Sequence, residues 1–577
     1  MIRLPALRRA AMVSFGLLAS CSSPPLDSVS DPEREAARGA PTIAGIGTST
    51  FIVTARDDEA RRLFQQGLQL DYAFEHAEAA RAFRAAFARD GTCAMCAWGV
   101  AHALGPNINA PDRRNEPEIR RYLARARVAA AGTTPVEQAL IEAMAVRYGD
   151  AAPARQRAAA ARAEAMCSTA AVERSVPPLE RSYAQAMKEV VERFPRDPDV
   201  VTLYADAVMV TSSWRWWDPK TGAANGDIEI VIDRLQEALK ENPQHTGLAH
   251  FLVHAAEQSP DPERAEPAAD ELGTLAPGAP HLVHMPSHIY VHVGRFADAS
   301  RVNERALQVQ RTYDAQITSA GFTADRPWDF HHLHFLWYAS LMEGRGDVAL
   351  ATARRIAGMT GGTPEMREYA RVLPMQTLVR FERWDEVLAQ PRPPQGLGLT
   401  EGIREYARGM AFAHTGHLAQ AQEAARSLAQ LRELSTVTRA RILDRPLPDE
   451  LLRISAAVLD GAIAFVPGGP ATAAQRRAAV EALEGAARLE DEIGGEPPRW
   501  AMSARLALAD ALRADGRPAD AEREYREHLR TQRDNGWGLR GLRLALAAQG
   551  RTSEAEAFDE RLRTVWIQAD AGLLTVR

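Results

Sequence analysis

The sequence predicts an all-α protein in which pairs of helices stack into an α-solenoid. Aromatic residues make up only 6% of the 577 residues, and runs in which Val, Ile and Thr alternate with polar residues are scarce, so strands are disfavoured. Gly and Ala recur five residues apart in short turns between amphipathic segments, and some of these turns lie 34 residues apart. A hydrophobic content of 46% with 25% charged residues fits a folded chain with a sizeable core.

Each predicted turn joins the two helices of one unit. Glycine permits the tight turn that ends the first helix, and the small alanine that follows lets the second helix pack closely against it. The steps from Ala265 to Ala299 and from Ala521 to Ala555 both span 34 residues. The turn pairs are Gly294/Ala299, Gly344/Ala349, Gly416/Ala421, Gly516/Ala521 and Gly550/Ala555.

This period, with a helix–turn–helix in each unit, resembles the tetratricopeptide repeat (TPR). In LFQQGLQLDYAFEHAEAARAFRAAFARDG, Gly67, Ala79, Phe83 and Ala86 occupy the small and aromatic positions of that repeat. The stretches GLAHFLVHAAEQSPDPERA, HLVHMPSHIYVHVGRFADA and FHHLHFLWYASLMEGRGD are similar to a bacterial TPR family. The resemblance implies a right-handed superhelix that serves as an interaction scaffold for a protein or peptide partner, and it brings no catalytic assignment.

The repeat pattern divides the chain into segments that match the TPR to different degrees. Residues 51–110 are predicted to form an N-terminal TPR unit, residues 183–390 a central array, and residues 401–577 a C-terminal array. Residues 111–182 look helical but match the repeat poorly. Pro and Gly in residues 391–400 mark a candidate linker, so the arrays form either one superhelix or two lobes.

Residues 1–20 have the features of a bacterial export signal. Three Arg precede an apolar run that is too short to span a bilayer. The sequence Leu18-Ala19-Ser20-Cys21 resembles the lipobox of bacterial lipoproteins, which implies acylation at Cys21; the alternative is an ordinary signal peptide with a chance Cys. With Ser22 next, the resemblance implies a lipid anchor in the cell envelope, on the outer membrane facing the periplasm. Residues 21–50 read as a flexible tether.

Ten of the 15 His lie between His245 and His334. In three successive units, the positions 15 and 11 residues before the turn alanine carry His and His, or His and Tyr. Residues four apart share a helix face, and the first helices of TPR units line the concave groove, so we predict a His-lined ligand-binding groove. The three pairs are His250/His254, His284/His288 and His334/Tyr338, and further groove residues are Glu257, His281, His292 and His331.

Three functions fit such a groove, and the sequence favours a non-catalytic scaffold that binds a protein or small ligand. The first alternative is a metal-binding protein for Zn or Cu, because imidazole nitrogens suit these metals. The second is an enzyme with metal-assisted or acid–base chemistry, although no G-x-S-x-G, P-loop, dinucleotide fingerprint or H-E-x-x-H motif occurs. Hydrogen-bonded core histidines copied by repeat duplication remain a further interpretation. The candidate metal ligands are His250, His254, His284, His288 and His334.

The cysteine pair and the net charge indicate the redox state and the partners to expect. Cys93 and Cys96 form a CxxC pair, which in an oxidising envelope is a candidate local disulfide; two half-buried thiols, a redox pair or half of a metal site are the alternatives. A net charge of −6 without a basic stripe argues against a nucleic-acid partner. The only membrane contact expected is the N-terminal lipid anchor.

Overall fold

The computed structural model describes residues 38–113, 115–149, 178–219, 221–434, 437, 440–442 and 445–573. These residues form helices, and the extended pairings among them are three isolated bridges. The predicted export segment, Cys21 and Cys167 lie outside the described residues. None of the helices within these ranges is both long enough and apolar enough to cross a membrane.

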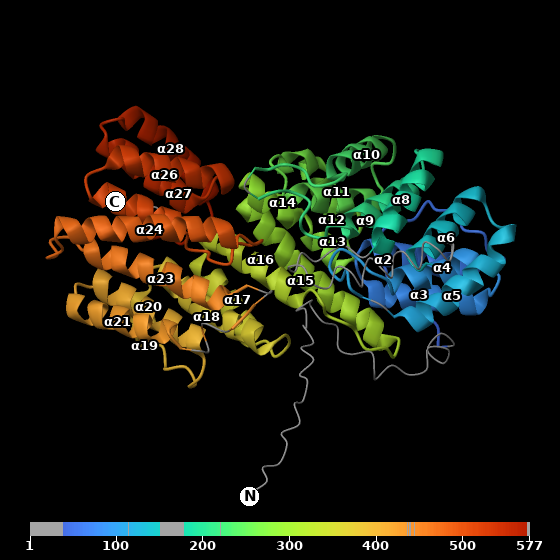
Figure 1. Ribbon diagram of the computed structural model, residues 1–577, viewed down its shortest axis with the longest axis horizontal. Helices are drawn as coiled ribbons and strands as arrows, with labels where there is room; N and C mark the ends of the chain where they lie inside the picture. The colour runs from blue at the N-terminus through green and yellow to red at the C-terminus, as the bar shows by residue number, and fades with distance from the viewer. Residues whose placement is uncertain are drawn as a thin grey trace, which may run out of the picture.

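The chain is an all-α solenoid whose consecutive helices pack as neighbours. Figure 1 shows an elongated body with the first helices at one end, the last helices at the other, and α13 to α16 between them. The N-terminal half comprises α2 (Asp58–Tyr72), α3 (His76–Arg89), α4 (Ala94–Ala103), α5 (Glu116–Ala129), α6 (Pro135–Arg147), α8 (Pro178–Arg193), α9 (Pro198–Val210), α10 (Ile228–Glu241), α11 (Thr246–Glu257) and α12 (Glu266–Leu275).

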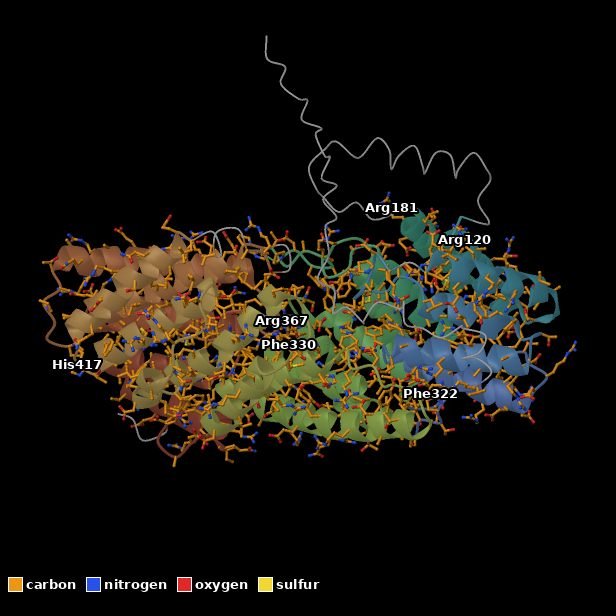
Figure 2. The ribbon with its side chains drawn as sticks, turned by 90° about the horizontal axis from the view of Figure 1, so that it is seen from below. Arg120, Arg181, Phe322, Phe330, Arg367 and His417 are labelled. Atoms are coloured by element: carbon orange, nitrogen blue, oxygen red, sulfur yellow. A yellow bond between two sulfur atoms is a disulfide. The ribbon has the colours of Figure 1, made fainter. Side chains whose placement is uncertain are left out.

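The middle of the body carries the segment that is rich in His. Pro286 lacks the N–H that a continuous helix needs, and the first helix of this unit is accordingly divided in two there. Figure 2, seen from below, places Phe330 of α16 near the middle of the long axis, with His417 and Arg120 towards its two ends. The helices are α13 (Pro280–His284), α14 (Pro286–Val293), α15 (Phe296–Ser319), α16 (Asp329–Met342), α17 (Gly346–Ala357), α18 (Pro364–Arg380) and α19 (Trp384–Ala389).

The C-terminal part continues the stack of helical pairs. The candidate linker at 391–400 contains the connection from α19 to α20, and α20 packs directly on α18, so helical packing continues across it. The helices are α20 (Gly398–His414), α21 (Leu418–Arg432), α23 (Leu447–Ala464), α24 (Ala473–Ile493), α25 (Ala504–Ala514), α26 (Pro518–Thr531), α27 (Gly536–Ala548) and α28 (Thr552–Val565).

The turns predicted from the Gly/Ala spacing are confirmed. All five glycines have a positive φ between 75° and 83°, the left-handed region that glycine adopts without a steric penalty. The five alanines are buried, with exposed fractions of 6% or less, which lets the paired helices approach closely. Helix starts follow their N-cap residues; Thr134 with Glu137 and Thr472 with Gln475 form capping boxes at α6 and α24.

Part of the predicted tether is packed against the body. Ile43 and Ile46 are buried, and burial of apolar side chains of this kind favours an ordered segment over a flexible one. The backbone N–H of Ala44 donates to Gln316 Oε1 of α15 at 2.8 Å, and the carbonyl of Gly45 accepts from Gly278 N at 2.7 Å. Residues 43–46 of the predicted tether are therefore packed against the helices.

The C-terminal helices return to the middle of the chain. Trp537 Nε1 donates to the Leu341 carbonyl at 3.0 Å, and Trp566 Nε1 donates to the Met342 carbonyl at 2.9 Å. The hydroxyl of Tyr338 donates to Gln532 Oε1 at 3.1 Å. The end of α16 is thus held by α26 to α28, and the loop before α25 reaches the His-rich helices.

Candidate metal centre

The histidines of the central array lie inside the molecule. Side chains from α11, α13, α14 and α16 meet there, and several segments cover them: Phe74 between α2 and α3, Trp214 before α10, Trp328 before α16 and Glu496 before α25. The expectation of an open, His-lined concave groove is therefore wrong, because these loops fill the space in front of the helices. The most deeply buried histidines, with exposed fractions of 2% or less, are His250, His254, His281, His284, His288, His332 and His334.

Three imidazoles, here called the first triad, converge through their Nε2 atoms. The triad consists of His284 on α13, His288 on α14 and His331 on α16. Nε2 of His288 lies 3.0 Å from Nε2 of His284 and 3.1 Å from Nε2 of His331. His331 is only partly buried, whereas His284 and His288 are fully buried.

The other ring nitrogen of His284 fixes its tautomer. Asn303 of α15 donates from Nδ2 to the Ala299 carbonyl at 2.7 Å, so its Oδ1 faces His284 Nδ1 at 2.6 Å. An amide oxygen only accepts, so Nδ1 carries the proton and Nε2 keeps its lone pair. His284 is therefore oriented and protonated as a ligand that binds through Nε2.

Two buried carboxylates hold His288. Its Nδ1 contacts Glu257 Oε2 and lies 3.1 Å from Glu496 Oε1. Although burial lowers the pKa of His288, these two carboxylates raise it to about 10. Burial by itself would raise the pKa of the Glu496 carboxyl. The neighbouring His292 and His288 outweigh burial and lower that pKa below its ordinary range. Because Glu257, His288 and Glu496 themselves come within 4.8 Å of one another, a metal at Nδ1 is an alternative use of the same groups.

Most other histidines of the cluster are held neutral. Burial, reinforced by neighbouring imidazoles, lowers the pKa of His250, His281, His284 and His331 well below the ordinary value. A neutral imidazole has one nitrogen lone pair available to a metal, whereas an imidazolium has none. These four histidines are therefore available as nitrogen ligands, whereas His288 must first lose a proton.

A second triad lies beside the first. It comprises His250 and His254 of α11 and His281 of α13, whose ligand atoms lie within 4.8 Å of one another. His250 Nδ1 is 2.6 Å from the Tyr72 carbonyl oxygen, and His254 Nδ1 is 3.1 Å from Glu257 Oε1. These acceptors place the proton on Nδ1 and leave Nε2 of both rings as the free nitrogen.

Some predicted residues lie outside the two triads. His334 Nε2 is 3.2 Å from the hydroxyl of Tyr369, and Tyr338 bonds to Gln532. His292 Nε2 is 3.4 Å from Glu496 Oε1, so it neighbours the centre without joining either triad. His334 is thus separated from the other candidate ligands because successive helices of a solenoid are rotated, so equivalent repeat positions do not keep facing one point.

Several residues of the centre could not be identified from the sequence. Asn303 lies on the second helix of its unit, and Glu496 lies 208 residues after His288 in the chain. His332 is buried against His284 with a ring-centroid distance of 4.6 Å, and its burial lowers its pKa to about 3. Only the crowding of His in this part of the sequence pointed towards His332.

The CxxC pair lies away from the triads. Cys93 and Cys96 form a disulfide at the start of α4, where Cys93 is the N-cap residue. The nearby His102 faces buried carboxylates, with its Nδ1 2.9 Å from Asp71 Oδ2 and its Nε2 3.7 Å from Asp206 Oδ2. This region is a structural ion-pair cluster beside a small cavity that Asp71, His76, His102 and Asp206 help to line.

Comparisons with known proteins give only remote likenesses. No protein-family model matches the chain, and no curated protein matches it. Among solved structures, human IFIT1 in a dimer with m7Gppp-AAAA is 13% identical, with 90% of this chain and 96% of that chain covered and a TM-score of 0.27. Yeast Tom70 is 12% identical, with 86% and 96% covered and a TM-score of 0.30. The TPR domain of P58(IPK) is 12% identical, with 59% and 89% covered and a TM-score of 0.18. Likenesses of this size assign no function to the chain.

Proposed function

We propose that the chain is a metal-binding α-solenoid whose first triad holds one transition-metal ion. The observation that carries the proposal is the buried convergence of three Nε2 atoms, with N···N separations of 3.0 and 3.1 Å. Two imidazole nitrogens bound to one ion at ~2.0–2.1 Å stand about 2.9–3.4 Å apart for bond angles between square and tetrahedral. An ion at the triad would replace the proton that His288 carries on Nε2, and the nitrogens joined by these two distances already have the spacing that the ion needs.

The outer partners support the same assignment. Metal-binding histidines usually donate their second N–H to a carboxylate or carbonyl-type oxygen, which fixes the ring and raises its basicity. Asn303 Oδ1 supplies this partner to His284, and Glu257 and Glu496 supply it to His288.

The donor set favours copper or zinc. Imidazole nitrogens suit Zn, Cu, Fe and Ni, whereas Mg and Ca prefer oxygen ligands. Among the divalent ions, copper binds nitrogen ligands most tightly in the Irving–Williams order. We expect copper to displace zinc from the triad when both are offered at equal concentration.

The solenoid is also a scaffold with extended helical surfaces of the kind that bind proteins or ligands. The histidines are buried and do not form the lining of an open groove, so they do not contact such a partner directly. We assign them to metal binding, and any partner would be recognised by other surfaces of the solenoid.

We also propose that the chain is exported and anchored in the cell envelope through Cys21. The lipobox resemblance supports this location, and so does the Cys93–Cys96 disulfide, because disulfides persist mainly in oxidising compartments. Metabolic labelling with a palmitate analogue should mark the wild-type protein and fail to mark Cys21→Ser. Equal labelling of both would contradict the anchor.

Metal analysis tests the proposed centre. Full-length protein is stripped with a chelator, reloaded with Zn(II) or Cu(II), and assayed for bound metal and affinity. His284→Gln and His331→Gln should each weaken binding at the first triad by more than ~10-fold, which is the lower range for loss of an outer-shell partner alone. His334→Gln is the matched control, because His334 is also buried and on α16 but bonds to Tyr369. Absence of bound metal in the wild type, or an equal loss in the control, would refute the proposal.

A further inference from the structure

The second triad has the features of a ligand set whose ligand is not supplied by the protein. Among the described residues, Nε2 of His250, Nε2 of His254 and both ring nitrogens of His281 are buried without a hydrogen-bond partner. Buried polar groups in folded proteins are nearly always paired, because an unpaired one loses its hydration and gains nothing in return. Three such rings meeting at one place could share one bound ion as their common partner.

Aromatic side chains enclose this triad. Phe74 lies against all three rings, with centroid distances of 4.3, 5.4 and 5.6 Å to His250, His254 and His281, and Trp328 stacks on His281 at 4.2 Å. Trp214 meets His254 edge-on at 5.6 Å. An apolar wall excludes water, which strengthens bonds between a metal and its ligands.

Two of these enclosing residues hold an unusual backbone conformation. Phe74 has a φ of 57° and Trp214 a φ of 61°, although neither is glycine. Bulky residues at positive φ are strained and persist where the surrounding structure requires them, which is most often at functional sites. Both place their rings against the second triad.

Glu257 joins the second triad to the first. Its side chain is fully buried; Oε1 lies 3.1 Å from His254 Nδ1, and Oε2 contacts His288 Nδ1. One carboxylate therefore orients one histidine of each triad. The ring centroids of His254 and His288 are 5.6 Å apart, within the range of 4.6–6.2 Å found inside the triads.

We propose that the second triad holds a second metal ion, so that the six histidines form one two-metal centre. The inference rests on the proposed function, since it adds an ion beside the one assigned to the first triad. All six ligands are imidazoles, and the nearby negative charges are those of Glu257 and Glu496. Glu496 also pairs with His292, so these carboxylates compensate two univalent ions better than two divalent ions, which would leave more positive charge in a buried site. The pair that fits is therefore two copper(I) ions, and oxidised copper or zinc would need added anions.

The hydrogen-bond partners of His250 and His254 differ from those of histidines in an ordinary protein core. Core histidines are tolerated when both nitrogens are hydrogen-bonded, and apolar side chains of the same volume fill such a space without unpaired atoms. Here Nδ1 of His250 and of His254 has an oxygen partner, while each Nε2 is buried without a hydrogen-bond partner. That division, one nitrogen oriented and one free, is the arrangement of a metal ligand.

Stoichiometry separates this inference from the proposed function. The metal-free full-length protein is titrated anaerobically with copper(I) against a chromogenic chelator. We expect two ions per chain in the wild type and one ion per chain in His250→Gln and in His281→Gln. His528→Gln is the matched control, because His528 is a buried histidine of α26 outside the centre, and it should keep two ions.

The spacing of the ions is tested on the same samples. After oxidation to copper(II), the wild type should show magnetic coupling, as a half-field EPR transition or as lost EPR intensity. The His281→Gln variant should show the full signal of an isolated copper. The magnetic coupling is measured on the wild-type protein itself, so this measurement remains decisive even if a variant folds poorly.

Each outcome has one meaning. One ion per chain in the wild type that is retained in His281→Gln and lost in His331→Gln overturns the second site and leaves the first. Two ions without magnetic coupling overturn the shared centre. No bound ion in the wild type overturns the proposed function itself.

Discussion

Replacing Glu257 by Gln is the most informative single change, because one carboxylate serves both triads. Its two oxygens face Nδ1 of His254 and Nδ1 of His288, and its exposed fraction is 0%. Glutamine has nearly the same shape but only one accepting oxygen, and its amide group donates. One of the two imidazoles must then face a donor with its own N–H, so its ring turns or its proton moves to Nε2, where it blocks metal binding.

The expected loss of metal affinity follows from removing one hydrogen-bond partner of a metal-binding histidine. Such losses weaken metal binding by ~10–100-fold, which corresponds to about 1.4–2.7 kcal/mol per site. We expect Glu257→Gln to raise the Kd of at least one ion by this factor at pH 7.5, measured by competition with a chromogenic chelator. The free energy of unfolding of the metal-free protein, measured by urea denaturation, shows whether the variant is folded.

Glu343→Gln is the matched control. Glu343 is a buried glutamate at the C-terminal end of α16, near Ser300 and Arg345, and none of its contacts involves the triads. Its replacement should leave both metal affinities unchanged. An unchanged affinity in a folded Glu257→Gln protein would refute the role assigned to Glu257, and an equal loss in the control would show that the effect is not specific to the centre.

Two predictions concern groups outside the centre. Burial raises the pKa of Glu343 to about 7 against 4.5, so the folded state binds the extra proton and stability falls as pH rises between these values. Relative to the wild type, the free energy of unfolding of Glu343→Gln in urea denaturation should therefore increase by up to about 3 kcal/mol more at pH 8 than at pH 5. An increase that does not depend on pH would contradict this. Burial lowers the pKa of His102, but Asp71 and Asp206 raise it above the ordinary value. The contribution of this ion pair to folding stability is therefore complete below about pH 6.5 and is lost at higher pH. His102→Ala should lower the free energy of unfolding, measured by urea denaturation, by about 3 kcal/mol at pH 6 and by less at pH 9. A larger loss at pH 9 than at pH 6 would refute the ion pair.

Local rules predicted the helical framework well. The φ values of Gly294 and Gly344, 83° and 76°, confirm that the spaced glycines mark turns, and the buried alanines that follow confirm close helix packing. These features depend on a few neighbouring residues, so a single sequence contains them. The same rules identified α11, α13 to α14 and α16 as the helices that carry the histidines.

The enclosure of the site could not be predicted in this way. Trp214 and Trp328 lie in the connections before α10 and α16, and their positions depend on how those connections fold over the helices. Glu496 comes from a different part of the stack and meets His288 only because the C-terminal helices return to α16. The sequence therefore located the histidines but predicted an open groove where the structure has a buried centre.

A buried centre changes what the solenoid can do. In a simple solenoid each repeat contacts its neighbours alone, and stability is the sum of these local contacts. Here Glu257 of α11 and His288 of α14 belong to neighbouring units and meet Glu496 of the loop before α25, so an ion at the triads would connect these two units with a distant part of the chain. Binding to the folded state alone stabilises it by ~2.7 kcal/mol at a free metal concentration 100 times the Kd. Since Glu496 is the contribution of the C-terminal helices to this centre, metal loading should protect the loop before α25 from hydrogen exchange more than the distal turns at Gly416 and Gly516. Equal protection everywhere would show that the ion stabilises the stack without linking its parts.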